Sequence, residues 1–488
     1  MKNKFLKNLL YLLIGLFFFY FCNGKYNFAL GAWLYPIFIL LVSRRESKIY
    51  SYLIIPVLIG IVSEISFWYT FEKPTSFLFY IPFCVGLFTG FIYLVDRIIY
   101  PKINGFMATL IFPLTYTAFD FCTNLFNPLG TTGILGYSQF NFLSFSQLAS
   151  ITGMWGITFM ITWFGSVVYW FIENYNDKKA ASRGITIYLL TLLPILIYGN
   201  IRLILPLEKG TVQISGIHTE DRLEGNQILE SLYSKDTITF KNKNAEILEN
   251  LTRKTEQEAS SGSKIIVWAE NSFYILKDNE DNAINQLKKI ASKNEIYLWV
   301  TPFVINKNSR SENKTLLFSP NGNLVSTHYK FGGNFLEGTV EGNQIIKTTK
   351  TTFGNLTGIV CWDGDFPSVV KQVGKENTDI LFIPASDWEA INPLHSIIAT
   401  FRGIENGCSV VRQTRNGLSF MNDPRGKTIT QMDHFQANSW TMSGQVPNKK
   451  IWSLYPIIGD LFGWLSFVGL LFLVIKTLVR RKKQVLYH

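Results

Sequence analysis

The chain has 488 residues, of which 48% are hydrophobic, 15% aromatic and only 17% charged, and its formal net charge is +11. Soluble proteins carry about 25% charged residues on average. The basic surplus is local, because residues 207–456 hold 27 basic and 27 acidic side chains and the apolar remainder carries the excess. Basic residues that lie beside apolar runs indicate how membrane-spanning segments are oriented, and they argue against a nucleic-acid partner.

Eight apolar stretches occupy the remainder of the chain. They cover residues 5–22, 28–42, 51–70, 77–95, 105–123, 146–172, 184–206 and 457–476. Most approach the roughly 20 residues that a helix needs to cross a bilayer. Lysines and arginines gather before the first stretch and after the second, fourth, sixth and eighth. The positive-inside rule therefore predicts cytoplasmic termini, and seven crossings then predict that residues 207–456 are extracytoplasmic.

This pattern predicts three parts. Residues 1–206 form a membrane domain with seven spans, 207–456 a polar domain, and 457–488 a last span with a basic cytoplasmic tail. The loop 124–145 is uncharged and rich in glycine and aromatic residues. It is predicted on the same side as the polar domain, and its composition favours a surface that dips into lipid or lines an entrance.

The polar domain alternates apolar strands with helices, which is typical of a layered α/β domain with a mixed sheet. The expected strands are 212–217, 264–269, 296–305, 315–318, 324–329, 356–360, 380–384, 409–413, 418–421 and 428–431. The expected helices are 237–259, 283–292, one from Pro367, and 392–406.

Three polar residues follow apolar strands, at the position where catalytic groups often lie. They are Glu270, Lys330 and Cys361. A carboxylate, an ammonium and a thiol suit acyl transfer through a covalent thioester, with the glutamate as base and the lysine at the oxyanion. The structural alternatives stay open at this point, since a cysteine at a strand end is more often a small buried hydrophobe. The five cysteines contain no CxxC pair and indicate neither a disulfide framework nor a zinc site.

The sequence resembles the nitrilase, or carbon–nitrogen hydrolase, superfamily, and more closely its membrane-embedded branch, the apolipoprotein N-acyltransferases. The Glu–Lys–Cys order carries part of the resemblance. The run Gly136-Tyr137-Ser138-Gln139 and the segment 147–159 resemble a GYSQ…QxAxxTGxxGxxF pattern of that branch. Further matches follow the cysteine at Ser386-Asp387-Trp388, His395, 401–407 and Val411-Arg412.

The resemblance implies an α-β-β-α sandwich in residues 207–456 and about eight spans in a bacterial inner membrane. It implies that Cys361 takes an acyl chain from a phospholipid and passes it to the N-terminal amine of a diacylated apolipoprotein. Glu270 would act as base and then acid, and Lys330 would stabilise the oxyanion. No cofactor or metal is implied, and a monomer is expected.

Other residues receive roles from the same resemblance. Glu337 would orient Lys330, although the flanking sequence departs from the usual PFGE. Trp362 and Asp363 replace a Tyr-Glu pair, so we expect an aromatic wall at Trp362 and a helix N-cap at Asp363. The remaining candidates for the substrate pocket are Tyr137, Gln139, Trp388, His395 and Arg402.

Two alternatives use the same nucleophile. In a membrane-tethered amidohydrolase, water would resolve the thioester, and a diverged paralogue would acylate another amine. A transporter or receptor with an ectodomain is a third alternative, which the Glu270–Lys330–Cys361 set argues against.

Overall fold

The computed structural model describes residues 2–22, 25–45, 51–68, 77–219, 227–230, 232 and 236–486. The chain divides into two compact units. The first comprises residues 1–127, 133–204 and 458–488, and the second comprises 128–132 and 205–457. The short piece 128–132 thus belongs to the second unit, although the chain on both sides of it belongs to the first.

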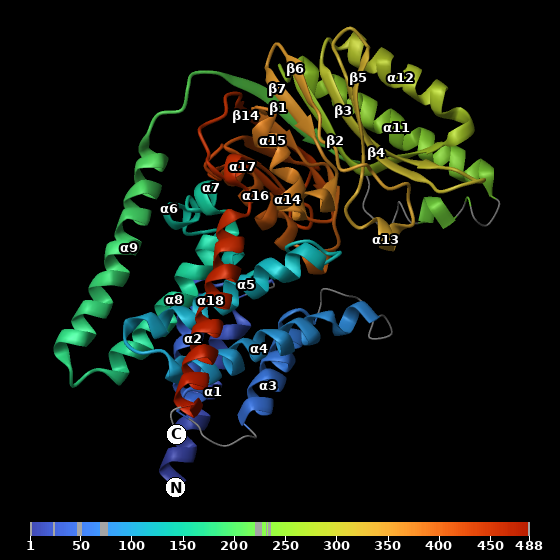
Figure 1. The fold of residues 1–488 in the computed structure, drawn as a ribbon. Helices are drawn as coiled ribbons and strands as arrows, with labels where there is room; N and C mark the ends of the chain where they lie inside the picture. The colour runs from blue at the N-terminus through green and yellow to red at the C-terminus, as the bar shows by residue number, and fades with distance from the viewer. Residues whose placement is uncertain are drawn as a thin grey trace. The chain divides into compact units, whose positions relative to one another are not determined.

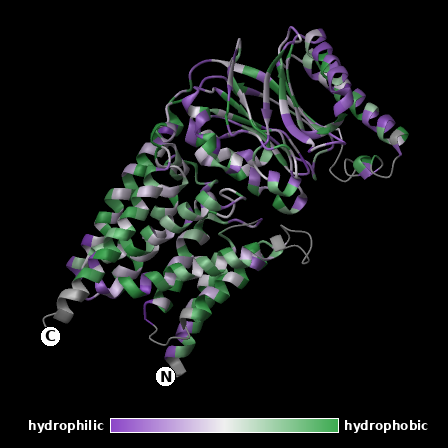
Figure 2. Cartoon of the chain, turned by 45° about the vertical axis from the view of Figure 1, so that its right-hand side comes forward, coloured by the Kyte–Doolittle hydropathy of each residue, from purple (hydrophilic) through white to green (hydrophobic). Residues whose placement is uncertain are grey.

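The first unit is helical, and hydrophobic residues dominate its helices (Figure 2). Its helices are α1 (Lys2–Tyr20), α2 (Ala29–Ser43), α3 (Ser51–Ser66), α4 (Ile81–Ile99), α5 (Ile111–Phe126), α6 (Leu143–Ser146), α7 (Ala149–Thr152), α8 (Met154–Glu173), α9 (Lys178–Ile204) and α18 (Leu461–Leu486). Short 3₁₀ turns precede α4 and α5, and another, η4, covers Leu135–Gln139.

Each of the eight apolar stretches contains a helix, but not all of these helices are long enough to span. Within the described residues, five are long and apolar enough to cross a bilayer: Ile81–Lys102, Phe106–Phe126, Met154–Glu173, Lys178–Ile204 and Leu461–Val479. Ala29–Ser43 and Leu53–Ser66 are shorter apolar helices. The structure therefore supports a membrane unit, while the count of about eight spans remains a prediction.

The predicted stretch 146–172 is not one continuous helix. The chain forms the short helices α6 and α7, breaks at Gly153, and continues as α8. The connection between α6 and α7 is held by a buried hydrogen bond from Ser150 Oγ to the Gln147 carbonyl at 2.6 Å. Hydropathy alone could not locate the break, because the residues on both sides of it are apolar.

The second unit contains two six-stranded sheets (Figure 1). The first has the order β14 (Thr441–Pro447), β1 (Thr211–Ile217), β2 (Ile265–Leu276), β3 (Tyr297–Ile305), β4 (Glu312–Phe318) and β5 (Leu324–Tyr329). The second has the order β6 (Thr348–Thr351), β7 (Gly354–Gly358), β8 (Ile380–Phe382), β10 (Ser409–Arg412), β12 (Leu418–Asn422) and β13 (Thr428–Asp433). The short strands β9 (Ala385–Ser386) and β11 (Thr414–Arg415) pair with each other.

The two sheets pack face to face between helices. Their shared core includes Ile265 and Trp299 from the first sheet and Phe382 and Val411 from the second, all at most 1% exposed. Helices α11 (Thr237–Ser260) and α12 (Glu280–Lys293) cover the outer face of the first sheet (Figure 1). Helix α16 (Leu394–Asn406), with the short helices α14 (Pro367–Val370) and α15 (Gln372–Lys375), covers the second. A four-residue helix, α17 (Tyr455–Ile458), leads to α18.

This arrangement is the expected α-β-β-α sandwich, with two sheets where strand periodicity alone had suggested one mixed sheet. Strands β6, β9, β11 and β14 were not predicted from the sequence. The helix expected from Pro367 is only α14, which ends after four residues. The strand expected to end before Glu270 continues to Leu276 as β2.

Candidate active site

Cys361 lies in the turn that follows β7. It begins the 3₁₀ turn η6 (Cys361–Asp365), and its backbone N–H donates to the Pro384 carbonyl at 2.9 Å. Its φ of +44° is a left-handed conformation that non-glycine residues rarely adopt. Such strain persists only where the surroundings enforce it, and it concentrates at functional sites.

Glu270 lies inside β2, where the pairing with β3 is irregular. The first carboxylate oxygen accepts hydrogen bonds from Lys330 Nζ at 2.8 Å and from Asn313 Nδ2 at 2.7 Å. The second accepts the backbone N–H of Ser386 at 2.8 Å. With 1% exposure and three donors, the Glu270 carboxylate has a fixed position.

Lys330 follows β5, and its ammonium lies between two carboxylates. It donates to Glu270 and also to Glu337, at the end of the short helix α13 (Asn334–Glu337). Asn313 bridges the same pair, because its Nδ2 also donates to Glu337 Oε2 at 3.2 Å. We call Glu270, Asn313, Lys330 and Glu337 the lysine cluster.

Asn313 was missed by the sequence analysis. The expected strand began at Thr315, whereas β4 begins at Glu312 and buries the polar run Glu312-Asn313-Lys314. The run of polar residues directly before the apolar part of the strand is a signal that could have identified Asn313 as a candidate.

The pKa shifts in the lysine cluster follow from burial and from the lysine charge. Burial raises the pKa of Glu270, but the Lys330 ammonium and the hydrogen bonds from Lys330 and Asn313 bring it below its usual value. Burial also raises the pKa of Glu337, and there the nearby ammonium does not reverse the shift. The two carboxylates outweigh burial at Lys330 and raise its pKa well above normal.

The Cys361 thiol has a pKa well above its usual value, because it is buried and lies near the negative charge of Glu270. Lys330 opposes this shift without cancelling it. At neutral pH the resting site therefore combines an ionised Glu270, a protonated Lys330 and a protonated thiol. That combination can pass a proton from sulfur to carboxylate during nucleophilic attack.

Asp363 connects two loops and also takes part in capping the turn η6, although it is not the N-cap residue itself. One carboxylate oxygen accepts the backbone N–H groups of Phe331 and Gly332 at 2.9 and 2.7 Å. The other accepts Val360 N–H and contacts His328 Nε2, both at 2.9 Å. Asp363 thus fastens the segment after Lys330 to the residue before Cys361. The N-cap prediction is wrong in position, since Val360 is the N-cap of η6 and Asp363 is the third residue of the turn, where its carboxylate accepts the N-cap backbone N–H as in a capping box.

Trp362 is 9% exposed and lies against His395, with ring centroids 5.6 Å apart. Its indole Nε1 donates to the Leu129 carbonyl at 3.3 Å. Trp388 also contacts His395, edge to face, with centroids 6.0 Å apart. The two tryptophans therefore border the imidazole.

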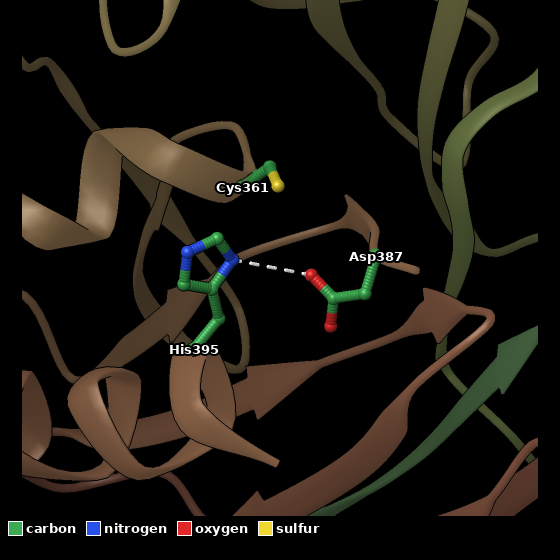
Figure 3. A group of neighbouring side chains, drawn as sticks. All are labelled: Cys361, Asp387 and His395. Carbon is green, nitrogen blue, oxygen red and sulfur yellow. Dashed lines mark hydrogen bonds and ion pairs between the residues drawn. The ribbon is translucent and has the colours of Figure 1, made fainter. Parts of the chain in front are cut away.

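His395, Asp387 and Arg412 form a second polar group beside Cys361. His395 Nδ1 lies 3.3 Å from Asp387 Oδ1, and the two side chains face each other next to the Cys361 thiol (Figure 3). Arg412 donates to both oxygens of Asp387, at 2.8 and 2.9 Å. The Asp365 carboxylate lies 3.7 Å from His395 Nε2. We call Asp365, Asp387, His395 and Arg412 the histidine cluster.

The remaining pocket candidates lie elsewhere. Arg402 is fully buried and pairs with Glu405 of the same helix at 3.3 Å. Tyr137 and Gln139 belong to the first unit, in η4. The Gln139 amide bonds to Trp33 Nε1 at 2.9 Å and to the Ala29 carbonyl at 3.0 Å. These contacts give Arg402 and Gln139 packing roles, and their contact with substrate remains a prediction.

Among the residues that the structure describes, one group of side chains has the spacing of metal ligands. Single donor atoms of Cys361, Asp387 and His395 lie within 4.8 Å of one another. Arg412 already occupies both oxygens of Asp387, so a cation would have to displace a guanidinium and tolerate its charge. The donor set therefore fits a metal ion poorly.

A cleft of about 410 Å³ is lined by Phe331 and Gly338, which follow Lys330 and Glu337 in the chain, but not by the side chains of the lysine cluster or by Cys361. Its walls include Pro128, Phe331, Phe335 and Phe366, and Arg310 and Glu341 provide charge. Small-molecule sites are commonly clefts of roughly 300–1,000 Å³ with mostly apolar walls and a few polar groups.

Comparison with known proteins identifies both units. The model of the carbon–nitrogen hydrolase family matches residues 233–451, and that of the apolipoprotein N-acyltransferase N-terminal domain matches residues 12–167. A Borreliella burgdorferi protein named apolipoprotein N-acyltransferase is 23% identical over 478 residues, covering 88% of this chain and 86% of its own. One of the same name from Geobacter metallireducens is 23% identical, covering 78% of this chain and 76% of its own.

Among solved structures, an amidase from Nesterenkonia sp. covers 49% of this chain and 92% of its own, with 16% identity and a TM-score of 0.40. The two family matches fall on different parts of the chain, and the relatives extend across both. The chain belongs to the apolipoprotein N-acyltransferase family, the membrane-embedded branch of the carbon–nitrogen hydrolases.

Proposed function

We propose that this protein transfers a fatty acyl chain from a membrane phospholipid to the N-terminal amine of a diacylated apolipoprotein. The observation that carries the proposal is a buried Glu270–Lys330 pair that acts electrostatically on the Cys361 thiol, in a chain that also has an apolar helical unit. Both substrates would be anchored in lipid, so the membrane would confine them near the site and lower the entropic cost of encounter.

In the first half-reaction, Cys361 attacks the ester carbonyl of the phospholipid. The thiol proton moves to Glu270 as the S–C bond forms, and Lys330 stabilises the negative charge on the carbonyl oxygen. The C–O bond then breaks, and Glu270 returns the proton to the departing lysophospholipid oxygen. The products are a thioester on Cys361 and a lysophospholipid.

In the second half-reaction, the apolipoprotein amine attacks the thioester. The N–C bond forms while Glu270 accepts a proton from nitrogen, the S–C bond breaks, and the proton returns to sulfur. Glu337 and Asn313 support both steps by holding Lys330 and Glu270 in place. The cleft lined by Phe331, Phe335 and Phe366 would receive apolar chains.

Transfer to a defined acceptor tests this proposal. Purified full-length protein is incubated with phospholipid carrying a labelled acyl chain and with a synthetic diacylated lipopeptide that has a free N-terminal amine. We expect a triacylated lipopeptide from the wild type and none from Cys361→Ala. Labelled free fatty acid with no acylated lipopeptide would instead show that water resolves the thioester, as in the hydrolase alternative.

We also propose that the second unit faces the extracytoplasmic side and that both termini are cytoplasmic. The charge pattern between the apolar stretches supports this topology. A cysteine introduced at the exposed position Asn308, in a Cys84→Ser background, should react with a membrane-impermeant maleimide added outside intact spheroplasts. Labelling only after the membrane is opened would contradict the proposed topology.

A further inference from the structure

The segment Leu129–Thr132 makes a set of hydrogen bonds to the turn that carries Cys361. Thr131 donates to the Asp365 carbonyl from both its backbone N–H and its hydroxyl, each at 2.9 Å. The Thr132 hydroxyl donates to Asp365 Oδ2 at 2.9 Å. The Leu129 carbonyl accepts the Trp362 indole N–H at 3.3 Å. We call residues 129–132 the clasp.

Gly130 allows the clasp to approach η6 this closely. Its φ is +67°, and a Cβ at this position would collide with the Asp365 backbone carbonyl. Any larger residue would therefore push the clasp away from the turn. Gly133, three residues later, has a φ of +91° with open space where a Cβ would lie. Both glycines have a positive φ, but a Cβ would collide with another segment only at Gly130.

A line of buried contacts leads from the clasp to the side of Cys361. Asp365, which accepts the Thr132 hydroxyl, lies 3.7 Å from His395 Nε2, an atom with no hydrogen-bond partner among the described residues. His395 Nδ1 in turn contacts Asp387 next to the thiol (Figure 3). Asp365, His395 and Asp387 are at most 3% exposed, so bulk solvent screens these contacts only weakly.

We propose that the clasp is a positioning segment for the nucleophile. The left-handed backbone at Cys361 requires surroundings that enforce it. The bond from Cys361 N–H to Pro384 fastens the beginning of η6, and the clasp fastens its end at Asp365. The inference rests on the proposed role of Cys361 as the acyl-accepting thiol.

The clasp has a particular place in the chain. Residues 127 and 133, on either side of the 128–132 piece, belong to the apolar unit, whereas the clasp itself belongs to the unit with the candidate site. A fragment comprising residues 205–457 would retain Glu270, Lys330 and Cys361 but would lack the clasp. The clasp therefore comes from a part of the chain that lies, in sequence, between two helices of the apolar unit.

The test compares Gly130→Ala with Gly133→Ala in the full chain. Each variant introduces a Cβ at a left-handed position, but only the first displaces the clasp. The rate constant of Cys361 acylation and its dependence on donor concentration are measured with phospholipid and, separately, with p-nitrophenyl butyrate. We expect Gly130→Ala to lower the rate constant by at least about tenfold, because small misplacements at a reacting centre can cost up to ~100-fold. The acylation rate constant of Gly133→Ala should stay within about twofold of the wild-type value. In both variants, the half-saturating donor concentration should change by less than about twofold.

A second pair of variants keeps the proposal testable if Gly130→Ala does not fold. Thr132→Val removes the hydroxyl that bonds Asp365, and Thr132→Ser retains it. We expect slower acylation in the valine variant and recovery in the serine variant. Loss in both variants would overturn the proposal, since it would indicate packing and not the hydrogen bond.

Equal acylation rate constants in Gly130→Ala and Gly133→Ala would also overturn it, as would a loss that appears only in donor affinity. If p-nitrophenyl butyrate acylates the wild-type Cys361 and phospholipid does not, the proposed donor is wrong while the clasp comparison still stands. If neither ester acylates Cys361, both the clasp and the proposed function fail.

Discussion

The lysine cluster and the histidine cluster both act on the Cys361 thiol, and they hold their charges differently. Lys330 lies between two carboxylates, and the pKa values of Glu270 and Glu337 shift in opposite directions. In the histidine cluster, Arg412 grips both oxygens of Asp387 and holds the pKa of that carboxyl far below its usual range, against the effect of burial. The first arrangement can exchange a proton with sulfur, whereas the second fixes its ion pair and suits positioning.

The largest expected effect is in the lysine cluster. Glu270→Gln removes the proton acceptor but keeps the shape, and proton transfer by a positioned side chain is worth about 10²–10⁴-fold in rate. We expect acylation of Cys361 to slow by that factor while the thermal midpoint changes little. Circular dichroism melting separates a chemical loss from unfolding. Full acylation activity in a folded variant would remove Glu270 from the mechanism.

The histidine cluster should respond mainly in stability. Asp387→Asn leaves the Arg412 guanidinium buried without its charged partner, and breaking a buried pair in this way costs about 3–5 kcal/mol. We expect this loss in the free energy of unfolding, measured by chemical denaturation of the detergent-solubilised protein. An unchanged unfolding free energy with lost acylation would reverse the division of roles between the clusters.

Glu337→Gln should have a smaller effect on rate than Glu270→Gln. Glu337 contacts Lys330 and not the thiol, and its side chain is 29% exposed. We expect roughly a tenfold slower acylation, below the ~10²–10³-fold typical for removal of an oxyanion donor. Glu376→Gln, at an exposed glutamate, is the matched control and should acylate at the wild-type rate. Equal losses in both variants would mean that the effect is not specific to Lys330.

The smallest effect concerns acid stability. Because the folded pKa of Asp387 lies below the unfolded value of about 3.9, its ionised form stabilises the fold above that pH. This contribution is lost as pH falls from about 4 toward the lower folded pKa. The free energy of unfolding should therefore decline below about pH 4, with a shallower slope in Asp387→Asn than in the wild type. Parallel slopes would show that Asp387 does not contribute.

Sequence patterns predicted the α/β elements and the candidate residues Glu270, Lys330 and Cys361, because strands and the polar residues after them are local features. The partners of these residues were harder to predict. Asn313 reaches Glu270 across the sheet, and Asp363 bonds N–H groups of Phe331 and Gly332 from another loop. Such contacts depend on tertiary geometry that no local spacing encodes.

The position of the clasp could not be predicted from the sequence either. The composition of loop 124–145 marked it as more than a connector, but nothing in the sequence indicated that residues 128–132 would join the second unit. The break at Gly153 was hidden for a related reason, since apolar residues continue through it. In both places, tertiary packing determines the structure, and the hydropathy of the sequence does not indicate it.

The most direct test of the mechanism is a time course of intact-protein mass after phospholipid is added without an acceptor. We expect the wild type to gain one fatty-acyl mass on Cys361 that neutral hydroxylamine removes, and we expect Glu270→Gln to gain it at least about 100 times more slowly. An adduct on another residue, or wild-type kinetics in Glu270→Gln, would contradict the mechanism.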